Sequence, residues 1–123
     1  MEAGALHILV VEDDPDIREI ILMVLGLEGF MVTGVAEGQG ALEKVKADQP
    51  DVVLLDVLLG DRDGREICQE IKANPETRNI PVMMVSASHG YHDPGGPDCP
   101  ADDFIAKPFD IHELVSRVKR LAA

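Results

Sequence analysis

The sequence predicts an α/β domain in three layers, with helices on both faces of a parallel sheet. Short apolar runs, typical of strands buried on both faces, alternate with stretches that carry apolar residues at helical spacing. Strands and helices in alternation form parallel sheets with right-handed crossovers. The chain of 123 residues has no internal repeat and no linker long enough to divide it, so residues 1–123 are expected to form one domain.

Five apolar runs are the expected strands. The first, residues 8–11, stops abruptly at Glu12, and the run 52–55 likewise ends on a carboxylate, that of Asp56. The remaining runs are 30–33, 81–85 and 104–106.

Four stretches are predicted as helices because their apolar residues recur every three or four positions. The first begins at Asp14-Pro15, a polar cap followed by proline, and ends at Gly29. The next two cover about residues 38–48 and 65–74, and the last follows Asp110 as its cap. The apolar faces expected for the first and last helices comprise Ile17, Ile20, Ile21, Val24 and Leu25, and Ile111, Leu114, Val115 and Val118.

Residues 89–101 interrupt this alternation. Six glycines and prolines in this segment argue against a regular helix. His89, His92 and Cys99 lie in the same segment, but their spacing matches no common zinc pattern, so they are expected to be loop residues.

Composition narrows the class of function. The net charge of −12 disfavours direct binding to nucleic acids or anionic membranes and favours divalent cations. Cys68 and Cys99 form no CxxC pair and no disulfide framework, which suits a reducing cytoplasm. No apolar run approaches the roughly 18 residues of a membrane span.

Polar residues directly follow the predicted strands: Glu12 and Asp13, Asp56, Ser86, and Lys107. In a parallel sheet these positions meet at the carboxyl edge, where open α/β sheets bind ligands. Carboxylates about 4 Å apart repel by roughly 4 kcal/mol at an effective dielectric near 20, so we expect either a cation among them or one group that stays protonated. Oxygen ligands favour Mg²⁺, with Mn²⁺ as a second candidate.

A nucleophilic carboxylate beside a metal, a lysine and a hydroxyl suits phosphoryl transfer to the carboxylate of Asp56. From about Leu6 to Leu121 the chain strongly resembles the receiver domain of two-component response regulators. The stretches that carry the resemblance are Ile8-Leu-Val-Val-Glu-Asp-Asp-Pro, Val53-Leu-Leu-Asp-Val, Asp63-Gly64, Val85-Ser-Ala87 and Lys107-Pro108-Phe109. It implies a flavodoxin-like sheet of five strands in the order 2-1-3-4-5, flanked by helices.

The resemblance also implies the roles of the acidic residues. Asp56 would accept a phosphoryl group from a sensor histidine kinase or a histidine phosphotransfer protein. Asp13, Asp56 and the backbone carbonyl of Leu58 would ligate Mg²⁺, and Glu12 would act through water. Asp14 fits better as a helix cap than as a metal ligand. Such a domain promotes its own phosphorylation and dephosphorylation but is not a turnover enzyme.

Further roles follow from the same resemblance. Lys107, Ser86 and Ala87 would bind the phosphoryl group, and Ser86 and Phe104 would form the switch pair that changes the interaction surface. Pro108 is a candidate cis-proline, although the sequence alone leaves the isomer open.

The chain departs from the family at two places. Gly60 stands where the family usually has proline, which predicts a more mobile loop. The segment 89–101 stands where the family forms its fourth helix, so that helix is expected to be degraded or irregular, and a homodimer that would use it stays open.

Three other functions compete with a phosphoacceptor. A degenerate receiver that only binds proteins is the nearest alternative, and the complete set of site residues argues against it. A haloacid-dehalogenase-type phosphatase normally has a second aspartate where this chain has Leu58. A nucleotide-binding domain would need a glycine-rich turn after the first strand, where this chain has Glu12, Asp13 and Asp14.

Overall fold

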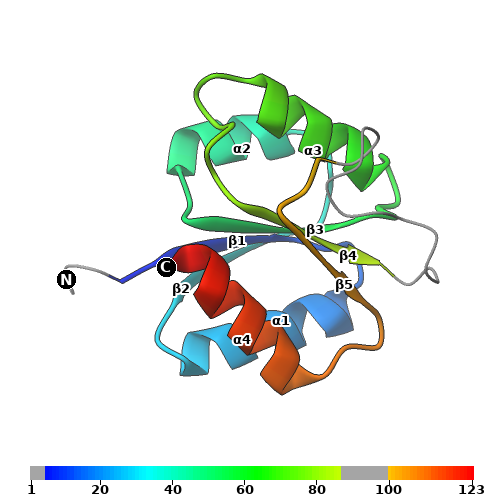
Figure 1. The fold of residues 1–123 in the computed structure, drawn as a ribbon. Coiled ribbons are helices and arrows are strands. Elements are labelled where there is room, and N and C mark those ends of the chain that lie inside the picture. The colour runs from blue at the N-terminus through cyan, green and yellow to red at the C-terminus, as the bar shows by residue number, and fades with distance from the viewer. Residues whose placement is uncertain (1–4, 87–99) are drawn as a thin grey trace.

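Five parallel strands form one sheet in the computed structural model, which describes residues 5–86 and 100–123 (Figure 1). The strand order is β2-β1-β3-β4-β5. This confirms the predicted parallel sheet and its order. The strands are β1 (His7–Val11), β2 (Met31–Val35), β3 (Val52–Asp56), β4 (Val82–Ser86) and β5 (Asp103–Ala106).

Helices cover both faces of the sheet, as the three-layer prediction requires (Figure 1). One face carries α1 (Pro15–Leu27) and α4 (Ile111–Ala122), and the other carries α2 (Ala41–Asp48) and α3 (Gly64–Ala73). The longest of these helices has 13 residues, and no helix in the described part of the chain has the length and apolar character needed to cross a membrane.

The central strands supply both hydrophobic cores. Successive side chains of a strand point to opposite faces, so in β1 Ile8 and Val10 pack under α1 and α4, while Leu9 and Val11 pack under α2 and α3. Every residue of β3 and β4 is buried. Because these strands are covered on both sides, their sequences are continuously apolar until the carboxyl edge.

Aspartates start three of the four helices in the described part of the chain. Asp14 accepts hydrogen bonds from the backbone amides of Asp16 and Ile17, as predicted for the cap of α1. Asp63 and Asp110 cap α3 and α4 in the same way. α2 differs, because its N-cap is Gly40, which has a φ of 83° and no side chain that could accept the capping hydrogen bond.

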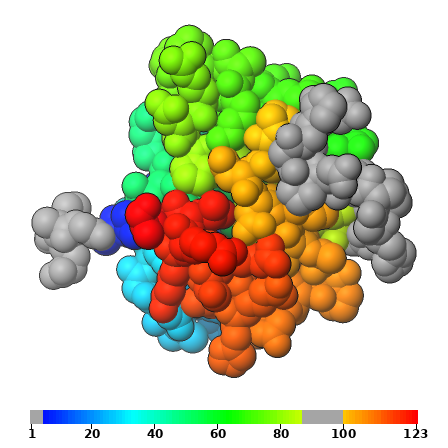
Figure 2. Space-filling model, viewed as in Figure 1, coloured from blue at the N-terminus to red at the C-terminus, as the bar shows by residue number. Residues whose placement is uncertain are grey.

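Strand β5 forms one edge of the sheet, and α4 lies beside it on the surface of the molecule (Figure 2). The guanidinium of Arg117 in α4 donates to Oδ1 of Asp103 at 2.7 Å and to the backbone carbonyl of Phe104 at 2.9 Å. Nη2 of the same guanidinium donates to Oε2 of Glu113, one turn earlier in α4, at 2.8 Å. A charged side chain of α4 thus satisfies polar groups of the edge strand.

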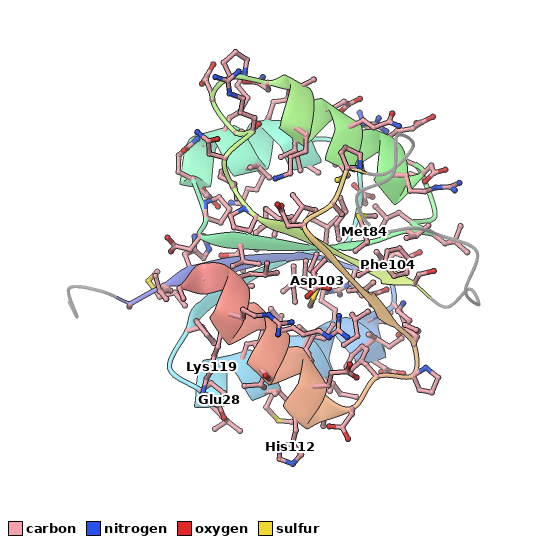
Figure 3. The ribbon with its side chains drawn as sticks, in the orientation of Figure 1. Glu28, Met84, Asp103, Phe104, His112 and Lys119 are labelled. Atoms are coloured by element: carbon pink, nitrogen blue, oxygen red, sulfur yellow. The ribbon has the colours of Figure 1, made fainter. Side chains whose placement is uncertain are left out.

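The two helices of this layer are also joined directly. Nζ of Lys119 in α4 lies 2.8 Å from Oε1 of Glu28, the residue that ends α1 (Figure 3). Both side chains are well exposed, so this ion pair contributes little to stability.

The apolar faces predicted for α1 and α4 are only partly buried. Ile20 and Ile111 are 43% and 44% exposed, because Ile21 and Leu25 fill the sheet-facing side of α1, and Leu114 and Val118 that of α4. The buried face of each helix is therefore narrower than its apolar face.

The prediction of a degraded helix over residues 89–101 falls mostly outside the described residues, as do His89, His92 and Cys99. The chain is described again from Pro100, and Ala101 is buried against the core under α2 and α3.

Gly64 leaves no room for a side chain. A Cβ atom at this position would overlap the backbone carbonyl oxygen of Asp56, so Gly64→Ala is expected to destabilise the fold by about 3 kcal/mol. Gly26 in α1 has nothing within 4 Å of such an atom, so Gly26→Ala should stabilise by about 0.5–1 kcal/mol. Urea unfolding of both variants checks this pair, and equal effects would contradict the steric argument.

Candidate functional site

Glu12 and Asp13 follow β1 at the carboxyl edge of the sheet. The backbone amide of Glu12 still bonds to β2, through the carbonyl of Val35 at 2.9 Å, and its side chain is buried. Asp13 is exposed. Arg18, one turn into α1, donates to the backbone carbonyl of Glu12 at 2.9 Å and so fixes the start of this loop.

Asp56 is the last residue of β3 and is only 4% exposed. The backbone amide of Leu58 lies 3.4 Å from its Oδ1, a long hydrogen bond. Carboxylate oxygens of Glu12, Asp13 and Asp56 all lie within 4.8 Å of one another. The structure therefore brings together the three acids that the sequence placed at this edge.

Lys107 enters the cluster from the opposite side, directly after β5. Its Nζ lies 3.0 Å from Oε1 of Glu12 and 3.4 Å from Oδ2 of Asp56. Its backbone amide donates to the carbonyl of Ser86 at 2.6 Å, and the Lys107–Pro108 peptide bond is cis. Lys107 thus contacts both buried carboxylates.

Burial and charge set the protonation of this cluster. Burial, with a smaller contribution from Asp56, raises the pKa of Glu12 from its ordinary value of 4.5 to about 7, although Lys107 acts in the opposite direction. Burial alone would lower the pKa of Lys107, but Glu12 and Asp56 outweigh it and leave that pKa above its ordinary value. Lys107 is therefore charged at neutral pH, whereas Glu12 keeps its proton to a higher pH than an exposed glutamate does.

The donor set fits a hard divalent cation. Three carboxylates and one ammonium group carry a formal charge of −2 when all are ionised, which one divalent ion balances. Oε1 of Glu12 is buried and has no hydrogen-bond partner among the described residues, since its contact with Lys107 is an ion pair without hydrogen-bond geometry. An ion, or water bound to it, would satisfy that oxygen, and Mg²⁺ suits such ligands.

The predicted switch residues lie on neighbouring strands. Ser86, fully buried, ends β4 and stands opposite Ala106, while Phe104 stands opposite Met84 (Figure 3). Phe104 is half-buried against the core under α2 and α3. Ala87, the remaining predicted phosphoryl-binding residue, lies outside the described residues.

Two charged side chains at this edge escaped the sequence prediction. Arg18 supports the loop after β1, and Asp61, in the loop after β3, bonds to the backbone of Gly38 and Gln39. Neither contact can be predicted from the sequence, because both side chains bond to backbone groups, which every residue type offers.

Fold and site together define a class: a flavodoxin-like domain whose carboxyl edge holds a buried aspartate, an acidic cluster and a lysine. The family profile of the response regulator receiver domain matches residues 8–119. The chain therefore belongs to this family, which receives phosphoryl groups from histidine kinases in two-component signalling.

Curated and solved relatives agree with this assignment. The transcriptional regulatory protein CseB of Streptomyces coelicolor is 41% identical over 118 residues, which are 95% of this chain and 49% of CseB. The chain thus spans about half the length of that relative.

Two solved structures are similar over nearly their whole length. One is the receiver domain of a sensor histidine kinase from Pseudomonas aeruginosa with a magnesium ion in its active site cleft (TM-score 0.87, 30% identity, 97% of this chain and 98% of that one). The other is the response regulator TrrA from Thermotoga maritima in complex with Mg²⁺ and BeF (TM-score 0.84, 30% identity, 94% and 98%).

The raised pKa of Glu12 predicts how stability depends on pH without divalent cations. Between pH 4.5 and about 7 the folded state binds more protons than the unfolded state, so the free energy of unfolding falls as pH rises through this window. The fall is at most about 3 kcal/mol, and Glu12→Gln should remove it. Urea unfolding in EDTA between pH 5 and pH 8 measures the difference between the two proteins.

The exposed Glu43 in α2 provides the control. Glu43→Gln should follow the pH dependence of the parent. Parallel curves for the parent and Glu12→Gln would contradict the prediction.

Proposed function

We propose that residues 1–123 form one receiver domain that takes a phosphoryl group from a phosphohistidine onto Asp56 in a Mg²⁺-dependent reaction. The observation that carries the proposal is the position of Asp56: a buried carboxylate within 4.8 Å of two others and 3.4 Å from Nζ of Lys107. Relatives with Mg²⁺ at their own sites support the choice of ion. Mn²⁺ is a second candidate for the same oxygen ligands.

In the proposed reaction an oxygen of Asp56 attacks the phosphorus atom of phosphohistidine. The oxygen–phosphorus bond forms as the phosphorus–nitrogen bond breaks, and the histidine nitrogen leaves with the electron pair. Bound Mg²⁺ would neutralise charge on the phosphoryl oxygens and the acids around them. Glu12, Asp13, Asp56 and the carbonyl of Leu58 are the residues proposed to hold it.

The chain's own residues orient and neutralise the transferred group. Lys107 already contacts Asp56, so its ammonium group can follow the charge onto the phosphoryl oxygens. The hydroxyl of Ser86 and the backbone of Ala87 are proposed to donate to the same oxygens. Movement of Ser86 towards them, with inward rotation of Phe104, would change the surface around β5. The acceptor is consumed in the reaction, so the domain is not a turnover enzyme.

An apolar groove beside the site suits the protein donor. It measures about 450 Å³ and opens between α1 and the turn after β5. Lys107 belongs both to this groove and to the acidic cluster, so a protein seated there is next to Asp56. Its lining comprises Ile17, Ile20, Lys107, Pro108, Phe109 and Ile111.

We propose a sensor histidine kinase or a histidine phosphotransfer protein as the occupant, because either must bring its phosphohistidine within bonding distance of Asp56. The net charge of −12 supports protein rather than nucleic acid as the direct partner. We also propose a cytoplasmic location, because the spacing of Cys68 and Cys99 suggests no disulfide framework.

Incubation with acetyl phosphate and Mg²⁺ tests the acceptor. The parent should gain one phosphoryl group by intact-mass analysis, and Asp56→Asn, which keeps the shape but lacks the nucleophilic carboxylate, should gain none. EDTA should abolish the adduct on the parent. An unmodified parent, or equal modification of the variant, would refute the proposal.

Ile20→Glu tests the groove. A charge in the centre of an apolar contact commonly costs more than about 1.4 kcal/mol of binding, so phosphotransfer from a protein donor should slow at least tenfold. Phosphorylation by acetyl phosphate should stay within about twofold of the parent, because that donor needs no docking surface.

Leu27→Glu is the matched control, since Leu27 is 80% exposed at the far end of the same helix and does not line the groove. Equal slowing by both variants would contradict docking at this groove.

A further inference from the structure

The loop between β3 and α3 contains Leu58. Backbone contacts within this loop join its first residues to its last ones. Leu58 pairs with Asp63 in an isolated antiparallel bridge, and the amide of Gly64 donates to the carbonyl of Val57 at 2.7 Å. Gly60 lies between these two points, where a Cβ atom would be 3.4 Å from Oδ2 of Asp13. The loop therefore passes close to the acidic cluster at Gly60, a residue with wide backbone freedom.

Asp61 ties this loop to a different part of the chain. Its Oδ1 accepts from the backbone amide of Gly38 at 2.9 Å, and its Oδ2 accepts from that of Gln39 at 2.8 Å. Both amides belong to the loop between β2 and α2. These two hydrogen bonds hold the pKa of Asp61 below its ordinary value, so the carboxylate is ionised at neutral pH.

The two loops also touch through apolar atoms. A Cβ atom at Gly38 would lie 2.7 Å from Cδ1 of Ile67, 3.1 Å from Cδ1 of Leu59 and 3.2 Å from Cβ of Arg62. Gly38 therefore sits directly on the loop that contains Leu59 and Arg62. A side chain at this position would separate the two loops and lengthen both bonds to Asp61.

Arg62 connects the same loop to α3 through a second contact. Its guanidinium donates to both carboxylate oxygens of Glu70, at 3.2 and 2.7 Å. The segment from Gly60 to Arg62 is thus held on one side by the loop before α2 and on the other by α3. The flexibility that glycine introduces at position 60 is opposed by Asp61.

We infer that Asp61 is a positioning residue for the metal site: through Gly38 and Gln39 it holds the β3–α3 loop so that Leu58 stays beside Asp13 and Asp56. The inference rests on the proposed function, because it concerns the carbonyl of Leu58 as a ligand of Mg²⁺. Hydrogen-bonded supports of metal ligands typically change metal affinity by roughly tenfold or more when they are removed.

A different role for Asp61 is to stabilise the loop that leads into α2, since Gly38 and Gln39 directly precede the N-cap Gly40. That role alone would change stability and leave Mg²⁺ affinity unaltered. The two roles are therefore separated by measuring metal binding and stability on the same variants.

Three variants make the test. Asp61→Ala removes both acceptor oxygens, and Asp61→Asn removes the charge but keeps one acceptor. Glu43→Gln removes an exposed negative charge near the same loop. Amide NMR shifts of Leu58, Gly38 and Gln39 are followed during titration with Mg²⁺, and circular dichroism reports folding.

Asp61→Ala is expected to weaken Mg²⁺ binding roughly tenfold and to shift the amides of Gly38 and Gln39. Asp61→Asn should fall between Asp61→Ala and the parent, and Glu43→Gln should match the parent. With acetyl phosphate, the Mg²⁺ concentration for half-maximal rate should rise in Asp61→Ala, while the rate at saturating Mg²⁺ stays within about twofold of the parent.

Unchanged Mg²⁺ affinity in Asp61→Ala would overturn the inference. Equal losses of Mg²⁺ affinity in Asp61→Ala and Asp61→Asn would also overturn it, because the loss of charge alone would then explain the effect. If Asp61→Ala fails to fold, the Mg²⁺ affinities of Asp61→Asn and Glu43→Gln are compared instead. Equal affinities of these two variants would overturn the inference. A parent that binds Mg²⁺ but is not phosphorylated would refute the proposed function and leave the metal-binding comparison intact.

Discussion

The burial of the two neighbouring carboxylates of Glu12 and Asp56 is the constraint on which the rest of this edge depends. Both are nearly inaccessible to water, at 1% and 4% exposed, and both lie in the carboxylate cluster at the end of a completely buried strand. Charges in such surroundings destabilise the fold unless an opposite charge is close. Lys107 supplies part of that charge by contacting both, and the cluster that remains is suited to a divalent ion.

Three loops in the described part of the chain meet this cluster, and a charged side chain contributes to holding each of them. Arg18 bonds to the carbonyl of Glu12 after β1, Asp61 bonds to the amides of Gly38 and Gln39 after β3, and Lys107 bridges the acids after β5. Loops at a binding site need fixed geometry but little buried apolar surface of their own. Directed charge-assisted hydrogen bonds provide that geometry without a larger core.

Most of the fold and the composition of the site were predictable because each depends on a local pattern. An apolar run followed by a carboxylate places Asp56 at a strand end whatever the rest of the chain does. The exposure of Ile20 was not predictable, since it depends on how α1 sits against the turn after β5. The contacts of Asp61 were hidden for a related reason: its partners are backbone amides 22 and 23 positions away, which any residue type offers.

Stability and binding oppose each other at this edge of the sheet. A neutral side chain in place of Glu12 would avoid the cost of burying a charge, the effect that raises the pKa of Glu12 to about 7. The same burial leaves Oε1 of Glu12 without a hydrogen-bond partner among the described residues. Ion binding favours the ionised form of Glu12, so the free energy lost in keeping a buried acid is recovered when the ion arrives. The sheet can tolerate the free-energy cost of the buried acid because β3 and β4 are buried along their whole length. Their burial stabilises the fold whether or not an ion is bound.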